Sequence, residues 1–148
     1  MSSVVTIPFE TTLRVRDSCL CLHTQRAARA LARRFDEALR PHGLTNGQFS
    51  LMMSLNRPQP APMASVASLL AMDRTTLTAA LKPLERRGLI KVMVDKSDRR
   101  SRRLILTQEG RSVLAGAVPV WEQTHREVEA LIPNADPCRL RSDLLALS

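Results

Sequence analysis

The chain has 148 residues, of which 44% are hydrophobic and 24% charged, which is typical of one globular domain and excludes a disordered or fibrous chain. No apolar run reaches the roughly 18 residues of a membrane span, and no secretory signal is visible at the N-terminus. Three cysteines are an odd number and too few for a disulfide framework. We therefore expect a single cytoplasmic domain.

The net charge of +8 is concentrated in one segment of the chain. Residues 74–103 contain ten basic and three acidic residues, so the rest of the chain carries about +1. A nearly neutral body with one basic segment is typical of a protein that binds a polyanion.

The first elements in chain order are helical. Residues 13–39 are rich in Ala, Leu and Arg and lack Gly and Pro, which predicts one long helix that stops at the breaker 40–43. Such a helix is longer than a domain of this size can cover, so we expect it to pack against a second subunit. Thr45 is the predicted N-cap of a second helix reaching residue 56, and the three prolines of 57–62 predict an extended connector.

A helix-turn-helix motif follows the connector. Residues 63–72 and 74–87 are predicted as two helices that meet at Asp73, the N-cap of the second, which Gly88 ends. Residues 89–94 and 103–106 alternate like strands on either side of the polar turn 95–102. A hairpin after a helix-turn-helix predicts a winged helix.

Two more helices complete the predicted fold, which is mainly α with a small β wing. Thr107 caps a helix reaching Pro133, with a bend expected at Pro119, and a short helix spans 136–147. We predict one domain over 1–148, in which 45–106 form a winged helix-turn-helix lobe for DNA binding and 11–40 with 107–148 form a helical dimerisation lobe.

The basic segment supplies the candidate contacts to double-stranded DNA. An Arg and short hydroxyl side chains at a helix N-terminus suit the major groove, and a cluster of guanidinium groups at a hairpin tip suits the narrow minor groove. We expect Asp95 and Asp98 to orient neighbouring arginines through carboxylate–guanidinium pairs. The predicted DNA-binding residues are Arg74, Thr75, Thr76, Thr78, Lys82 and Arg86 on the helix, and Lys96, Arg99, Arg100 and Arg102 on the wing.

Three sequence segments resemble a known family: GLTNGQFSLMMSL at 43–55, DRTTLTAALKPLERRGLI at 73–90 and DKSDRRSRRLILTQEGR at 95–111. They are similar to the MarR family of winged-helix transcription regulators, and the likeness covers roughly residues 13–131. The resemblance implies a homodimer that binds a pseudo-palindromic operator. It also implies a repressor that a small molecule or oxidation releases, with the terminal helices forming the dimer.

The resemblance also makes the cysteines candidate redox sensors. Cys21 falls where the organic-hydroperoxide-responsive members carry their reactive cysteine, but Phe35 falls where those proteins have a tyrosine. Cys19 is a second candidate and Cys138 a conceivable resolving thiol. The alternative is that Cys19 and Cys21 are small apolar residues of a helical dimer interface.

A small-molecule pocket between the dimer helices and the DNA-binding lobe is the other expectation from the family. Its candidate lining residues are His23, Phe49, Trp121 and His125. No metal site, cofactor or enzymatic activity is expected, because the sequence has no HExxH, GxSxG, P-loop or CxxC motif. The alternative function is a winged-helix protein-interaction module whose basic wing binds an acidic partner.

Overall fold

The computed structural model describes residues 4–148 and divides the chain into two compact units, one up to Arg34 and one from Phe35 to Ser148. In the first unit, α1 (Phe9–Ser18) is followed by α2 (Leu20–Leu39), which continues into the second unit. The prediction of one helix over 13–39 is therefore wrong.

The helix breaks at Cys19, whose backbone is extended at φ −70° and ψ 111°. Its Sγ accepts a hydrogen bond from the Leu22 N–H at 3.4 Å, which gives one free N–H at the start of α2 an acceptor. The hydroxyl of Ser18 donates to the carbonyl of Arg14 in the last turn of α1. Both side chains thus support a break that the amino-acid composition of residues 13–39 did not indicate.

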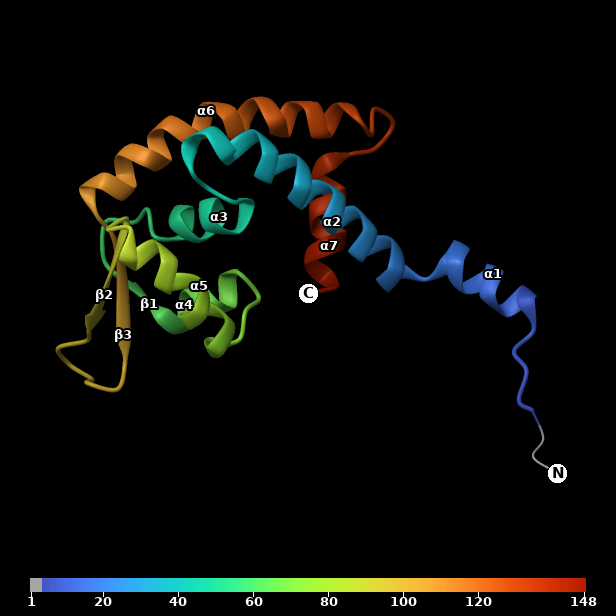
Figure 1. The fold of residues 1–148 in the computed structure, drawn as a ribbon, viewed down its shortest axis with the longest axis horizontal. Helices are drawn as coiled ribbons and strands as arrows, with labels where there is room; N and C mark the ends of the chain where they lie inside the picture. The colour runs from blue at the N-terminus through green and yellow to red at the C-terminus, as the bar shows by residue number, and fades with distance from the viewer. Residues whose placement is uncertain (1–3) are drawn as a thin grey trace. The chain divides into compact units, whose positions relative to one another are not determined.

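The second unit contains the winged helix and two further helices (Figure 1). The mainly α fold with a small β wing is confirmed, and the predicted hairpin is present. The elements are η1 (Arg40–His42), α3 (Asn46–Ser54), β1 (Ala61–Pro62), α4 (Met63–Leu69), α5 (Arg74–Arg86), β2 (Ile90–Val94), β3 (Arg102–Leu106), α6 (Gln108–Ala130) and α7 (Pro137–Ala146).

The sheet has the antiparallel order β1-β3-β2. In β1, Ala61 lies opposite Leu104, and Pro62 opposite Arg103. The short strand β1 was expected as a connector because its neighbourhood is rich in proline. Since β1 is an edge strand, the missing N–H of Pro62 is tolerated there.

The predicted helix starts are confirmed by their caps. Thr45 forms a capping box with Gln48 at the start of α3, and Asp73 accepts from the Thr76 N–H at 2.7 Å at the start of α5. Thr107 caps α6 in the same way. Gly88, with φ +70°, follows the end of α5 in the left-handed conformation that favours glycine.

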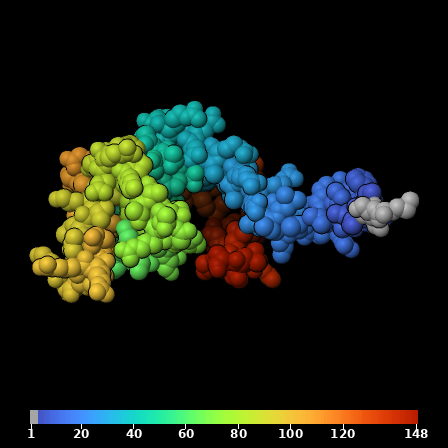
Figure 2. All heavy atoms as spheres, turned by 60° about the horizontal axis from the view of Figure 1, so that its bottom comes forward, coloured from blue at the N-terminus to red at the C-terminus, as the bar shows by residue number. Residues whose placement is uncertain are grey.

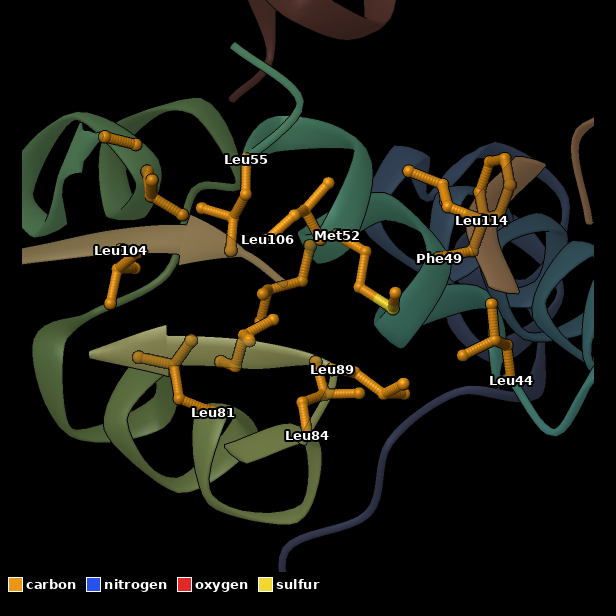
Figure 3. Packing of buried hydrophobic residues seen from close by; sticks show 14 of the residues in the cluster. Leu44, Phe49, Met52, Leu55, Leu81, Leu84, Leu89, Leu104, Leu106 and Leu114 are labelled. Carbon is orange, nitrogen blue, oxygen red and sulfur yellow. The ribbon is translucent and has the colours of Figure 1, made fainter. Parts of the chain in front are cut away.

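One hydrophobic core holds the winged helix together (Figure 3). Leu77 and Leu84 place one face of α5 in this core, and each is fully buried. Leu104 and Leu106 of β3 enter it from the sheet, and Met52 from α3. The opposite face of α5 is therefore left to solvent, which positions the candidate site. No helix in the described part of the chain is long and apolar enough to cross a membrane.

Candidate DNA-binding surface

The exposed face of α5 carries a shallow hollow. It is lined by five of the first nine residues of the helix: Arg74, Thr75, Thr78, Ala79 and Lys82. All five are exposed. Four of them are predicted DNA contacts, and the structure brings these four together. Arg86 lies further along α5, in a second depression with Lys82 and Glu85.

Thr76 is placed differently from the other predicted threonines. It does not line the hollow, and its N–H donates to the carboxylate of Asp73 at 2.7 Å. This bond holds the pKa of Asp73 below its ordinary value. Thr76 therefore belongs to the cap that starts α5, whereas Thr75 and Thr78 lie on the surface that the helix presents.

A concavity of about 480 Å³ separates α5 from the wing. Arg74 lines it from the helix, and Arg102 and Arg103 line it from β3. Figure 2 shows α5 and the wing beside each other on one face of this unit. A DNA strand that runs between a recognition helix and a wing would cross this hollow.

The turn of the wing is fixed by its two aspartates. Asp95 accepts from the N–H and hydroxyl of Ser97 and from Arg103 Nε at 2.9 Å. These bonds lower the pKa of Asp95 to about 2, and the bonds from Ser97 contribute more to this shift than the bond from Arg103. The charge of Asp95 thus supports the wing above about pH 4, and this support is lost only as the pH falls toward 2.

Asp98 has a different role from the one predicted. It accepts from the backbone N–H of Arg100 at 3.0 Å and from the Ser101 hydroxyl, so it shapes the turn and does not pair with a guanidinium group. The prediction of a carboxylate–guanidinium pair is confirmed for Asp95, whose partner is Arg103, and wrong for Asp98. A carboxylate that caps a tight turn satisfies the nearest N–H first.

The basic residues of the wing fall into two groups. Arg102 donates to the carbonyl of Arg99 at 2.9 Å, and Arg103 donates to Asp95 and to the carbonyl of Pro60. These two arginines brace the wing internally. Lys96, Arg99 and Arg100 are exposed, and in the described residues their side chains have no hydrogen-bond or ion-pair partner. We call these three residues the wing tip.

We predict that the Asp95–Arg103 pair sets DNA affinity through the position of the wing. Asp95→Ala and Arg103→Ala should each weaken DNA binding several-fold, and the double variant should lose about as much as either single variant, because both remove one shared contact. A double-mutant cycle of DNA affinity by fluorescence anisotropy measures this. If the loss of affinity in the double variant equals the product of the two single-variant losses, Arg103 contacts DNA itself.

Two hollows flank the stacked rings of Phe49 and Trp121, whose centroids are 6.1 Å apart. The ring of His125 also stacks on Trp121, with the centroids 4.8 Å apart. One hollow, of about 220 Å³, contains all three of these predicted pocket residues, together with Phe35, Leu39, Asn46 and Ser50. The other, of about 550 Å³, is apolar and lies between α3, Leu69 and α6.

His23, the fourth predicted pocket residue, belongs to the first unit, and its place in a pocket stays a prediction. Its Nδ1 lies 2.7 Å from the carbonyl oxygen of Cys19. The lining by Phe35, Leu39, Asn46 and Ser50 is not predicted from the sequence, in which Phe35 stands out only as a substitute for tyrosine. The helical spacing of Phe35 and Leu39 on one face was the available signal.

All three cysteines are free thiols. Cys21 is exposed, and Gln25 Nε2 donates to its Sγ at 3.1 Å. Cys138 is also exposed, in the first turn of α7, where Arg141 donates to its Sγ at 3.3 Å. Cys19 caps α2, so an apolar filler role does not describe it fully.

The fold and this surface together define a winged helix-turn-helix protein of the kind that binds double-stranded DNA. The sequence model of the MarR family matches residues 44–101. The transcriptional regulator MosR of M. tuberculosis, solved in complex with DNA, is 40% identical in sequence to this chain. The two structures match with a TM-score of 0.78 over 88% of this chain and 93% of MosR. The chain belongs to the MarR family of winged-helix transcription regulators.

Two other relatives agree with this assignment. The transcriptional repressor CouR, solved on a 23-mer DNA duplex, is 29% identical with a TM-score of 0.70 over 90% of this chain and 92% of CouR. The regulator TtmR of Methylorubrum extorquens is 33% identical over 97 residues, which are 66% of this chain and 50% of TtmR. The chain thus spans half the length of TtmR. These relatives are named as regulators and not as enzymes.

Proposed function

We propose that the chain is a homodimeric, sequence-specific regulator that binds an operator in double-stranded DNA and acts as a repressor. One observation carries the proposal: a concavity lies between α5 and the wing, and both α5 and the wing tip expose cations that have no partner among the described residues. In this arrangement α5 enters the major groove and the wing tip reaches an adjacent minor groove. Arg74 and Lys82 supply the positive charge on α5, and Arg99 and Arg100 supply it on the wing.

Exposed apolar side chains in both units support the homodimer. Leu145 of α7 and Leu147, directly after the helix, are 76% and 63% exposed, and no residue of α7 is buried. In the first unit, Phe9 and Leu20 are 71% and 68% exposed. A second copy would cover such surface. Residues 11–40 and 107–148 are the proposed dimerisation lobe, residues 45–106 the proposed DNA-binding lobe, and the cytoplasm the proposed location.

Release of the DNA is proposed to follow binding of a small molecule or oxidation. The hollow beside Phe49 and Trp121 supports the first route, because apolar cavities with few polar groups are the usual sites for small ligands. The exposed thiol of Cys21 supports the second route, because oxidants reach exposed thiols first. The two routes differ in their response to dithiothreitol.

The test is an electrophoretic shift of the promoter region beside the protein's own gene, at several salt concentrations. We expect saturable, sequence-dependent binding, with log K falling by about 0.9 per neutralised phosphate for each unit of log salt. The parallel arms add an organic hydroperoxide and then dithiothreitol, with Cys21→Ser as the matched variant. Loss on oxidation that dithiothreitol reverses, and that Cys21→Ser abolishes, supports the redox route.

Other outcomes separate the alternatives. Sequence-dependent binding that the hydroperoxide does not change would support the repressor without the redox route. The effector would then be sought among small molecules that bind in the hollow. Equal binding to every DNA sequence, lost at modest salt, would overturn the proposal. Tight binding to an acidic protein in that case would identify the protein-interaction module instead.

A further inference from the structure

The hollow on α5 exposes methyl groups between two cations. The hydroxyl of Thr78 donates to the carbonyl of Arg74 at 2.8 Å, four residues earlier on the same helix. A threonine bonded back to its helix in this way has its hydroxyl committed to that carbonyl, so the methyl group of the exposed Thr78 is the part left to contact a ligand. Ala79, the next residue, has only a methyl group to offer. Arg74 and Lys82 stand on either side of these two residues in the hollow.

The two remaining threonines of this helix start are different. Thr75 also lines the hollow, and in the described residues its hydroxyl makes no side-chain hydrogen bond, so it is available to a base. Thr76 lies outside the hollow, and its backbone N–H donates to the carboxylate of Asp73 in the cap of α5. Three threonines in four positions therefore present three different surfaces: a hydroxyl, a cap and a methyl group.

Among the four bases, only thymine presents a methyl group in the major groove. A methyl-lined hollow with a cation at each end is complementary to a thymine C5-methyl group, with Arg74 placed for a base acceptor and Lys82 for a phosphate. We propose that Thr78 and Ala79 read thymine through its methyl group and so determine the base preference of α5. This inference rests on the proposed function, since it needs a specific operator.

The experiment starts with selection of binding sites from a random duplex pool by the full-length protein. Each thymine that recurs in both half-sites is then replaced by deoxyuridine, which removes only the C5-methyl group. The protein variant is Thr78→Ser, which removes the methyl group and keeps the hydroxyl bond to Arg74. Thr45→Ser is the matched control, because it removes the same group from an exposed threonine outside the candidate DNA-binding surface, and serine keeps the N-cap bond of α3.

We expect Thr78→Ser to weaken binding to the thymine duplex about threefold to fivefold per half-site, as for the loss of one buried methyl group. At one thymine position, deoxyuridine should weaken the parent equally and leave Thr78→Ser unaffected. Thr45→Ser should bind like the parent on both duplexes.

Parent-like binding by Thr78→Ser on the thymine duplex would overturn the inference. So would equal losses on the thymine and deoxyuridine duplexes at every position, since the two methyl groups would then not touch. In both cases a selected sequence would still support the proposed function. If the pool yields no preferred sequence, the proposed function fails together with this inference.

Discussion

The double variant Arg99→Ala/Arg100→Ala is expected to lose at least about 100-fold in DNA affinity while keeping its fold. Each guanidinium that contacts DNA contributes on the order of 1 kcal/mol or more, and a dimer carries two wing tips. The plot of log K against log salt should become less steep by about 3.6, which is about 0.9 for each of four lost contacts.

The wing turn should survive this change because its internal bonds do not use these two side chains. The N–H of residue 100 donates to Asp98, and the carbonyl of residue 99 accepts from Arg102, and alanine retains both groups. The thermal midpoint should therefore stay within about 1 °C of the parent, since surface substitutions away from such bonds have small effects.

Arg126→Ala is the control for charge. Arg126 lies on α6, is exposed and, among the described residues, donates only to Gln123. Its removal takes away one positive charge per protomer far along the helix from the wing, where the double variant removes two. We expect it to change the salt dependence little. A loss of log K in Arg126→Ala that is half the loss in the double variant would mean that overall charge, and not the wing tip, binds the DNA.

The division of the wing into bracing and free cations was not accessible from the sequence. The segment DKSDRRSRR contains five basic residues, and nothing in the sequence distinguishes one from another. Arg103 reaches Pro60, 43 residues earlier, and this contact exists only because β1 pairs with β3. Contacts over such separations depend on the tertiary fold, and no local pattern encodes them.

Local signals, in contrast, predicted the helix boundaries of the winged helix well. The caps Thr45, Asp73 and Thr107 each act within three residues, and Gly88 ends α5 through its own backbone conformation. The break at Cys19 is the exception. Its capping atom is a sulfur, a weak acceptor that is not among the usual N-cap side chains.

In the candidate site, too, the sequence predicts some features and not others. The basic face of α5 follows from helical spacing, because the buried leucines at 77, 81 and 84 leave the opposite side to solvent. The separate roles of Thr75, Thr76 and Thr78 do not follow, since they depend on which donor finds an acceptor within its own turn. Such differences are visible only in the hydrogen bonds of the structure.

Gly110→Ala is expected to destabilise the protein by about 2–4 kcal/mol, although alanine is the better helix former. Gly110 lies buried in the first turn of α6, and a Cβ there would collide with the backbone carbonyl of Leu89. That carbonyl accepts from the Thr107 N–H at 3.1 Å. The collision would therefore separate the start of α6 from the start of the wing.

Gly116→Ala provides the control on the same helix. Its added Cβ would meet only the ring of His42, at an ordinary contact distance of 3.5 Å, so the gain in helix propensity should stabilise the protein by up to about 1 kcal/mol. Urea unfolding followed by circular dichroism measures both variants, with equal m-values as the check on two-state behaviour.

Because Thr107 also donates to the carbonyl of Gly88 at the end of α5, displacement of this junction should reach the DNA-binding surface as well. Gly110→Ala should then weaken DNA binding even under conditions where it remains folded, whereas Gly116→Ala should bind like the parent. Equal stability of the two variants would show that the close approach of α6 to Leu89 relaxes at little cost. Lost stability with unchanged DNA affinity would show that the junction supports the fold without positioning the wing.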